Sequence, residues 1–163
     1  SLISSIGGIA LQSVAEKIVA IAPLIILMPA LNNLVGSFGT IISSKFTTML
    51  YTGKISLAKS KEHLIALMFM IAFVSSIYLG IASVLLGTFY GHPFSYTTLI
   101  EIVGISVFAT LLLVGFISVI SIALGFYIFR KNEDPNNFLI PISTSIADIG
   151  SMTILAVMVT LFF

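Results

Sequence analysis

The sequence is poor in charged residues. Of its 163 residues, only 8% are Asp, Glu, Lys or Arg, whereas 58% are hydrophobic. A soluble domain carries charge on about a quarter of its residues, so this chain lacks the polar surface that a water-soluble globule needs. Intrinsic disorder is excluded as well, because disordered chains combine low hydrophobicity with high net charge. The formal net charge of +1 gives no reason to expect a nucleic-acid partner.

Two residue types are missing altogether. The absence of cysteine excludes disulfides, thiolate metal sites and cysteine nucleophiles. The absence of tryptophan means that an aromatic belt at the membrane surface must come from the five Tyr and 13 Phe residues. The remaining class is an all-α integral membrane protein. A spanning helix takes about 20 residues, so we expect residues 1–163 to form one domain of five transmembrane helices, with no soluble domain.

The apolar runs predict five helices, over residues 2–15, 17–51, 60–90, 98–129 and 137–163. The first run is shorter than the minimum of about 17 residues for a span, so we expect it to be the second half of a helix that begins before Ser1. The second run is too long for one straight span and contains Pro23 and Pro29. A proline inside a helix removes a backbone hydrogen bond. We therefore predict that this helix is kinked at Pro29 or broken between Pro29 and Gly39.

The distribution of basic residues predicts the orientation. Five of the seven lie in two loops, 52–61 and 130–136, and the positive-inside rule places these loops in the cytoplasm. The C-terminus would then be outside, with the plasma membrane as the expected location. Five spans cannot form two equal inverted halves, and no internal repeat is apparent. Two-fold symmetry of the kind that many transporters have would therefore come from a homodimer.

One acid lies deep in a predicted span. Asp148 is about twelve residues into the fifth helix, near the centre of the bilayer, where a charge costs about 3 kcal/mol on insertion scales and often marks an ion path. Spacings of three and four residues place polar residues and a proline on the same helix face, with Ser145 beside them: Asn137, Pro141, Thr144, Asp148 and Ser151. The alternative is that Asp148 is protonated and only joins two helices by a hydrogen bond.

A matching polar stripe follows Pro29 in the second helix. It contains Asn33, Gly36, Ser37 and Thr40, with Asn32 beside them. Small residues let helices approach closely, so helix packing alone also explains this stripe. Irregular backbone at this depth is tolerated only where it is buried or lines a water-filled cavity. We therefore interpret the stripe as a pore lining.

The chemistry of these groups indicates a hard cation. Oxygen ligands without Cys or His favour Mg²⁺, Ca²⁺ or Mn²⁺ over softer metals. One carboxylate is weak for a dehydrated divalent ion, but two Asp148 side chains facing each other across a dimer axis would carry two charges. Mg²⁺ keeps most of its waters and is usually held by one or two carboxylates, so such a pair fits a hydrated Mg²⁺.

Two segments contain recognisable motifs. The first, in the second predicted helix and the loop after it, has Pro29-Ala30-Leu31, Gly36, Ser43-Ser44-Lys45, Thr47-Thr48 and Gly53-Lys54. The second, at the fifth predicted helix, has Asp134-Pro135-Asn136-Asn137, Pro141-Ile142, Ser145 and Asp148. They resemble the second-helix and fifth-helix motifs of the MgtE-type divalent cation transporters and are most similar to the eukaryotic solute-carrier relatives of that family. The chain departs from the bacterial pattern after Gly36, where bacterial members are richer in Asn and Gln.

The resemblance implies a five-helix domain that pairs two-fold and transports Mg²⁺ through a central pore. Bacterial members are homodimers, and the eukaryotic relatives carry two such domains in one chain. Asp148 matches the pore acid of the family, and Gly36 matches a glycine of its pore segment. Thr144, one turn before the acid, would offer its backbone carbonyl.

We therefore predict a transporter of divalent cations, with Mg²⁺ as the transported ion and with membrane lipid and a second copy of the chain as partners. The expected metal-binding residues are Asp148, Thr144 and Gly36. The expected pore-lining residues are Asn32, Asn33, Ser37, Thr40, Asn137, Pro141, Ser145 and Ser151. Two alternatives remain: a carrier of another substrate coupled to protons or Na⁺, and a membrane assembly subunit that transports nothing. An enzyme is disfavoured, because an intramembrane aspartyl protease needs two acids at depth and a Ser–His dyad needs an embedded His.

Overall fold

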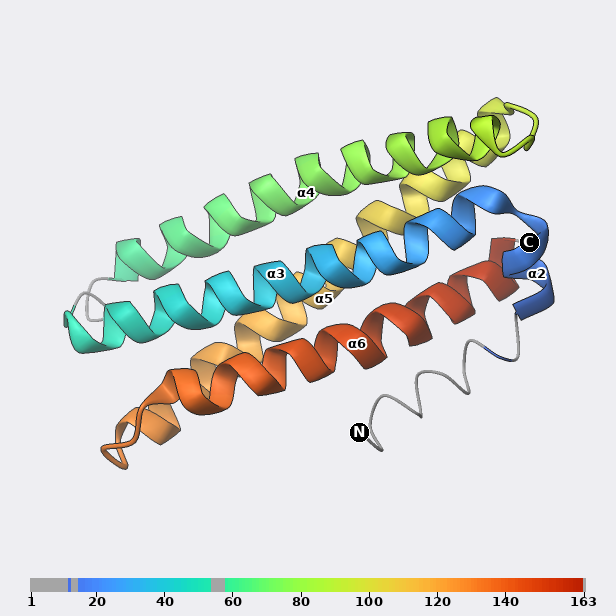
Figure 1. The fold of residues 1–163 in the computed structure, drawn as a ribbon. Helices are drawn as coiled ribbons and strands as arrows, with labels where there is room; N and C mark the ends of the chain where they lie inside the picture. The colour runs from blue at the N-terminus through green and yellow to red at the C-terminus, as the bar shows by residue number, and fades with distance from the viewer. Residues whose placement is uncertain (1–11, 13–14, 54–57, 163) are drawn as a thin grey trace.

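The computed structural model describes residues 12, 15–53 and 58–162, which form helices and no strands. The helices are α2 (Ala15–Ala20), α3 (Ala22–Tyr51), α4 (Ala58–Phe89), α5 (Tyr96–Phe129) and α6 (Pro135–Phe162). The four long helices lie side by side and alternate in direction (Figure 1). Helices α3 and α5 each pack against the three other long helices. The all-α prediction is therefore confirmed for the described part of the chain.

Four of the described helices are long and apolar enough to cross a membrane. Three of them agree with the predicted spans 60–90, 98–129 and 137–163 to within two residues at each end. The first predicted span, 2–15, lies outside the described residues except for residues 12 and 15. The membrane class is thus supported by four helices, and the fifth span stays a prediction.

The second predicted helix, 17–51, is divided at a different place from the one expected. Helix α3 continues from Ala22 through Pro29 to Tyr51, so the predicted break between Pro29 and Gly39 is wrong. The chain instead leaves helical geometry at Ile21, with φ −120° and ψ 92°, and Pro23 lies in the first turn of α3. A proline fits there because first-turn N–H groups have no partner inside the helix. The polar stripe after Pro29 is therefore carried by continuous helix, and the kink at Pro29 stays a prediction.

The bundle buries small polar residues and exposes large apolar ones. The serines Ser43, Ser76, Ser106, Ser121 and Ser143 are almost fully buried between helices. The outer face of α5 exposes Phe108, Leu112, Phe116 and Val119. Membrane helices associate in this way, because lipid covers the apolar faces while small residues let the backbones approach.

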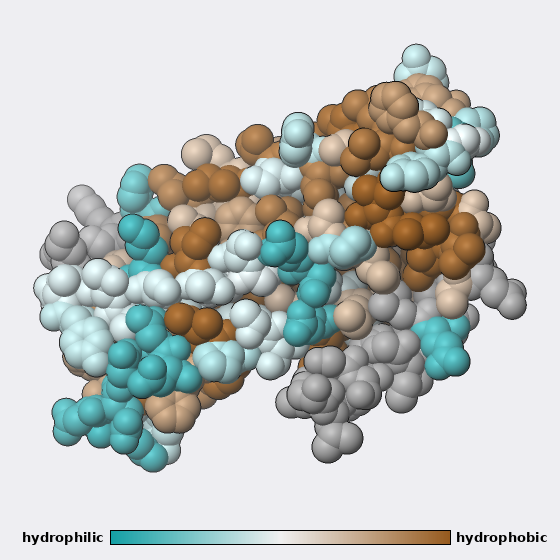
Figure 2. Space-filling view, in the orientation of Figure 1, coloured by the Kyte–Doolittle hydropathy of each residue, from teal (hydrophilic) through white to brown (hydrophobic). Residues whose placement is uncertain are grey.

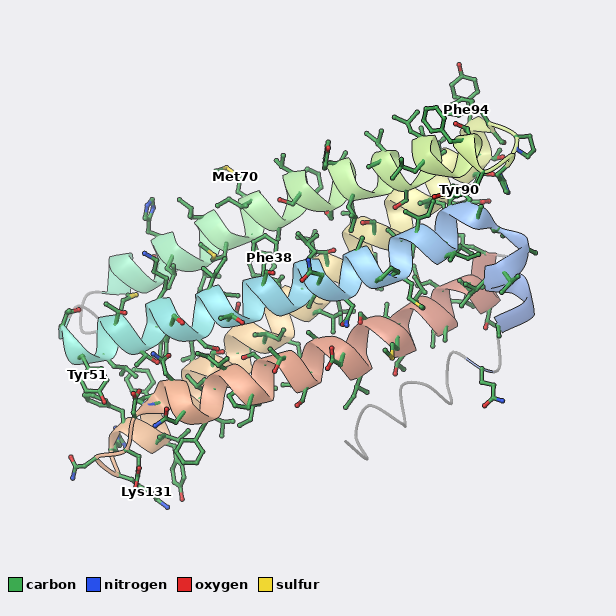
Figure 3. The ribbon with its side chains drawn as sticks, viewed as in Figure 1. Phe38, Tyr51, Met70, Tyr90, Phe94 and Lys131 are labelled. Carbon is green, nitrogen blue, oxygen red and sulfur yellow. The ribbon has the colours of Figure 1, made fainter. Side chains whose placement is uncertain are left out.

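Aromatic side chains mark both ends of the long helices. Tyr51 lies at the same end as Lys131, whereas Tyr90 and Phe94 lie at the opposite end (Figure 3). The Lys131 ammonium lies 4.5 Å from the centroid of the Tyr127 ring, a cation–π contact. This arrangement agrees with the aromatic belt that the sequence must build without tryptophan.

The end of α3 and the beginning of α4 lie at the same end of the bundle as the connection between α5 and α6 (Figure 1), so the described residues of the two loops rich in basic residues share that end. Their predicted bounds need correction, since α4 already begins at Ala58 and α6 at Pro135. The start of α6 is fixed by Asp134, whose side-chain oxygen Oδ1 accepts a hydrogen bond of 3.0 Å from the backbone N–H of Asn136. This is the N-cap geometry of a helix with proline as its first residue, and it sets the register of α6.

Candidate functional site

A polar groove lies between α3 and α6 and has a volume of about 430 Å³. Helix α3 contributes Pro29, Asn32, Asn33, Gly36, Ser37 and Thr40, and α6 contributes Thr144 and Asp148. Hydrophilic residues continue along the face that α3 and α6 share, as far as the middle of the bundle (Figure 2). The two polar stripes predicted from sequence, more than 100 residues apart, are thus adjacent in space.

Asp148 is held by a chain of two hydrogen bonds that crosses from α6 to α3 and back. The amide Nδ2 of Asn32 donates to Oδ1 of Asp148 at 2.9 Å. The hydroxyl of Ser151 donates to Oδ1 of the same asparagine at 2.8 Å. The second carboxylate oxygen of Asp148 has no hydrogen bond among the described residues. Asp148 therefore keeps one oxygen available to a ligand in the groove.

The hydroxyl groups of the groove are donors to their own helices. Ser37 donates to the carbonyl of Asn33 at 2.8 Å, and Thr40 donates to that of Gly36 at 3.1 Å. Thr144 donates to the carbonyls one turn earlier, at 3.0–3.1 Å. Because each proton is used within the helix, the hydroxyl oxygens retain lone pairs that can accept hydrogen bonds from water or contribute to a cation site.

Four of the predicted pore-lining residues lie outside the groove. Asn137 and Pro141 are exposed on α6, between its start and the groove. Ser145 is partly buried and does not line the groove. Ser151 is buried, with 3% of its surface exposed, and it contacts Asn32 rather than the groove.

The structure also contains a hydroxyl cluster that the sequence did not predict. Ser43 of α3 lies 2.9 Å from the hydroxyl of Ser143 in α6 and 3.4 Å from that of Ser121 in α5. Gly39 lies against the same α6 residue, since a Cβ built on this glycine would be 2.9 Å from the Ser143 Cβ. Ser43 and Gly39 thus join helices, whereas Gly36 lies beside the groove. The four-residue spacing of the small residues Gly39 and Ser43 was the signal in the sequence that could have predicted this helix contact.

The described residues contain no cluster of three or more His, Cys, Asp or Glu side chains that could hold a metal ion. Asp148 is the one acid among the described residues that line the groove. A metal held tightly and without water needs more ligands than this. The groove can instead attract a cation electrostatically and accept hydrogen bonds from its bound water.

These features define a class: a helical protein with four helices long and apolar enough to cross a membrane and a polar groove that contains an acid. The family model of the MgtE divalent cation transporters matches residues 28–158. The chain therefore belongs to the MgtE family of divalent cation transporters, a family of transporters rather than enzymes, as the sequence motifs predicted. Searches of curated proteins and of solved structures gave no significant match.

Proposed function

We propose that this protein carries Mg²⁺ across the membrane along a path that includes the groove between α3 and α6. The observation that carries the proposal is the position of Asp148. It lies near the middle of a 28-residue helix, and one of its oxygens is free of hydrogen bonds in the described structure. The amide and hydroxyl groups around it are hard oxygen ligands, which suit Mg²⁺ better than softer metals. Membership of the family supports a divalent cation as the substrate.

We further propose that two copies of the chain face each other across this groove. One groove offers a single carboxylate, which is weak for a divalent ion. Asn33 is an exposed polar residue in a helix long and apolar enough to cross a membrane, and lipid cannot satisfy the hydrogen bonds of its side-chain amide. A two-fold pair would remove Asn33 from lipid and place two Asp148 carboxylates on one path. Mg²⁺ would retain most of its waters between them.

The residues that line the groove then have roles in this path. Asp148 supplies the attracting charge, and the Thr144 hydroxyl and the open space at Gly36 accommodate the hydrated ion beside it. The other groove residues, Asn32, Asn33, Ser37 and Thr40, accept or donate hydrogen bonds to its water. The exposed Asn137 and Pro141 extend the polar face of α6 toward the basic loops, which we place in the cytoplasm by the positive-inside rule.

A purely structural role for Asp148 has one observation in its favour, the hydrogen bond from Asn32. It gives no account of the free second oxygen or of a groove lined by polar groups. A carrier coupled to protons or Na⁺ would use the same groove as a channel, but it would draw its energy from the gradient of the coupled ion. Channel and carrier are therefore distinguished by transport measurements on the intact protein.

The test is uptake of Mg²⁺ into proteoliposomes that contain the purified protein. We expect uptake down a Mg²⁺ gradient, with loss of most of the flux in Asp148→Ala. Repeating the assay with and without an opposing proton or Na⁺ gradient distinguishes a channel from a coupled carrier. Absence of Mg²⁺ flux from a folded, reconstituted wild-type protein would contradict the proposal.

A further inference from the structure

The orientation of the Asn32 amide is determined by its two partners. The Ser151 hydroxyl has one proton, and it donates to the amide oxygen at 2.8 Å. Its alternative acceptor, the backbone carbonyl of Asp148, is farther away at 3.3 Å. If the amide were turned over, its oxygen would lie 2.9 Å from a carboxylate oxygen, and two acceptors at that distance repel each other. The amide N–H therefore points at Asp148.

This arrangement leaves the two oxygens of Asp148 unequal. Oδ1 is occupied by the N–H of Asn32, while the other oxygen has no partner among the described residues and the side chain lines the groove. Each carboxylate oxygen has two lone pairs, and one of those on Oδ1 is used by the N–H of Asn32, so the other oxygen is the more available to an ion or its water. Asp148 is thus presented mainly through one oxygen.

The number of oxygens offered matters for the choice of cation. Ca²⁺ accepts six to eight oxygen ligands and often binds a carboxylate through both oxygens, whereas Mg²⁺ requires octahedral geometry and keeps several waters. An Asp148 that offers one oxygen therefore favours a hydrated Mg²⁺. An Asp148 with both oxygens free would suit Ca²⁺ better.

We propose that Ser151 and Asn32 act as positioning residues that limit Asp148 to one free oxygen and thereby favour Mg²⁺ over Ca²⁺. This inference rests on the proposed transport function, and it assigns a role to a serine that does not itself line the groove. Ser151 acts through Asn32. Outer partners of metal ligands commonly change metal affinity by about 10- to 100-fold when they are removed.

The experiment compares Mg²⁺ and Ca²⁺ uptake by proteoliposomes containing wild type, Ser151→Ala, Asn32→Ala or the double variant. We expect the ratio of Ca²⁺ to Mg²⁺ uptake to rise about tenfold in Asn32→Ala, which removes the hydrogen bond to Oδ1 of Asp148, and to rise less in Ser151→Ala, in which the Asn32 amide loses its second partner. Since Ser151 acts through Asn32, its replacement should add nothing in the Asn32→Ala background. The matched control is Ser83→Ala, because Ser83 is equally buried, at 1% exposure, and donates only to Leu79 of its own helix, at 2.9 Å.

Each outcome decides the inference. A Ca²⁺ to Mg²⁺ ratio in Ser151→Ala equal to that of Ser83→Ala overturns it, as does a Ser151→Ala effect that persists undiminished without Asn32. If Ser151→Ala does not fold, Asn32→Ala frees the same oxygen, and an unchanged ratio there overturns the inference too. Normal Mg²⁺ uptake by Asp148→Ala would instead refute the transport role of Asp148, which separates the two failures.

Discussion

Gly39 and Ser143 join α3 to α6 at a distance that only a glycine permits. A Cβ on Gly39 would lie 2.9 Å from the Ser143 Cβ, which is closer than real Cβ contacts come. The neighbouring Gly36 differs, because its Cβ would meet only the Ala147 Cβ, at 4.0 Å. Two glycines that look alike in the sequence therefore have different roles.

The first prediction is that Gly39→Ala destabilises the protein and Gly36→Ala does not. Overpacking a tight helix contact costs about 1–3 kcal/mol, since Ser143 is fully enclosed and its backbone must move. The measurement is thermal unfolding of both variants in the same detergent. Equal melting temperatures for the two variants would contradict the packing assigned to Gly39.

The second prediction concerns the space beside Gly36. Gly36→Leu should fold but slow Mg²⁺ uptake strongly, because the new side chain would occupy the groove. Gly104→Leu is the matched control, since Gly104 lies on α5 and a Cβ there meets nothing within 4 Å. Uptake that falls equally in both variants would mean that the loss has another cause than filling of the groove.

The third prediction concerns the buried hydroxyl cluster. Ser43→Ala should lower the free energy of unfolding by about 1 kcal/mol, because it leaves the Ser143 and Ser121 hydroxyls without their common partner. The double variant Ser43→Ala/Ser143→Ala should lose less free energy of unfolding than the sum of the losses in the two single variants, since the two residues share one contact. Additive losses in a denaturation series would show that the serines act independently.

The fourth prediction uses the absence of cysteine, which makes any introduced thiol unique. If two copies face each other across the groove, Ser37→Cys should give a disulfide-linked dimer on oxidation in membranes. Phe116→Cys is the control, because Phe116 is 54% exposed and lies away from the groove. Cross-linking of Phe116→Cys with none at Ser37→Cys would place the contact on another face.

Much of the fold follows from the sequence. Apolar runs bounded by polar or Gly/Pro segments gave three of the four long helices to within two residues, because lipid requires every backbone group in the span to be paired internally. The break near Pro29 was wrong, since the first turn of α3 accommodates Pro23 and the helix tolerates Pro29. Proline identity alone does not say which of two prolines interrupts a helix.

The candidate site was predicted in part. Helical spacing identified Asp148 and the α3 stripe, and these residues do share one groove. The same spacing included Ser151 in the lining, although it lies behind Asn32. Periodicity assigns residues to a face of one helix, but the neighbouring helix decides which of them remain open. The partners Ser121 and Ser143 were missed because a serine within an apolar helix does not indicate which residue of a neighbouring helix it contacts.

The most direct measurement is Mg²⁺ uptake by Asp148→Asn compared with wild type, with thermal unfolding as the control for folding. The substitution keeps an oxygen that can accept the hydrogen bond from Asn32, so the helix contact can persist while the negative charge is lost. We predict a melting temperature close to that of wild type and a large loss of Mg²⁺ flux. Wild-type flux in Asp148→Asn would contradict the central claim that this carboxylate serves the transported ion.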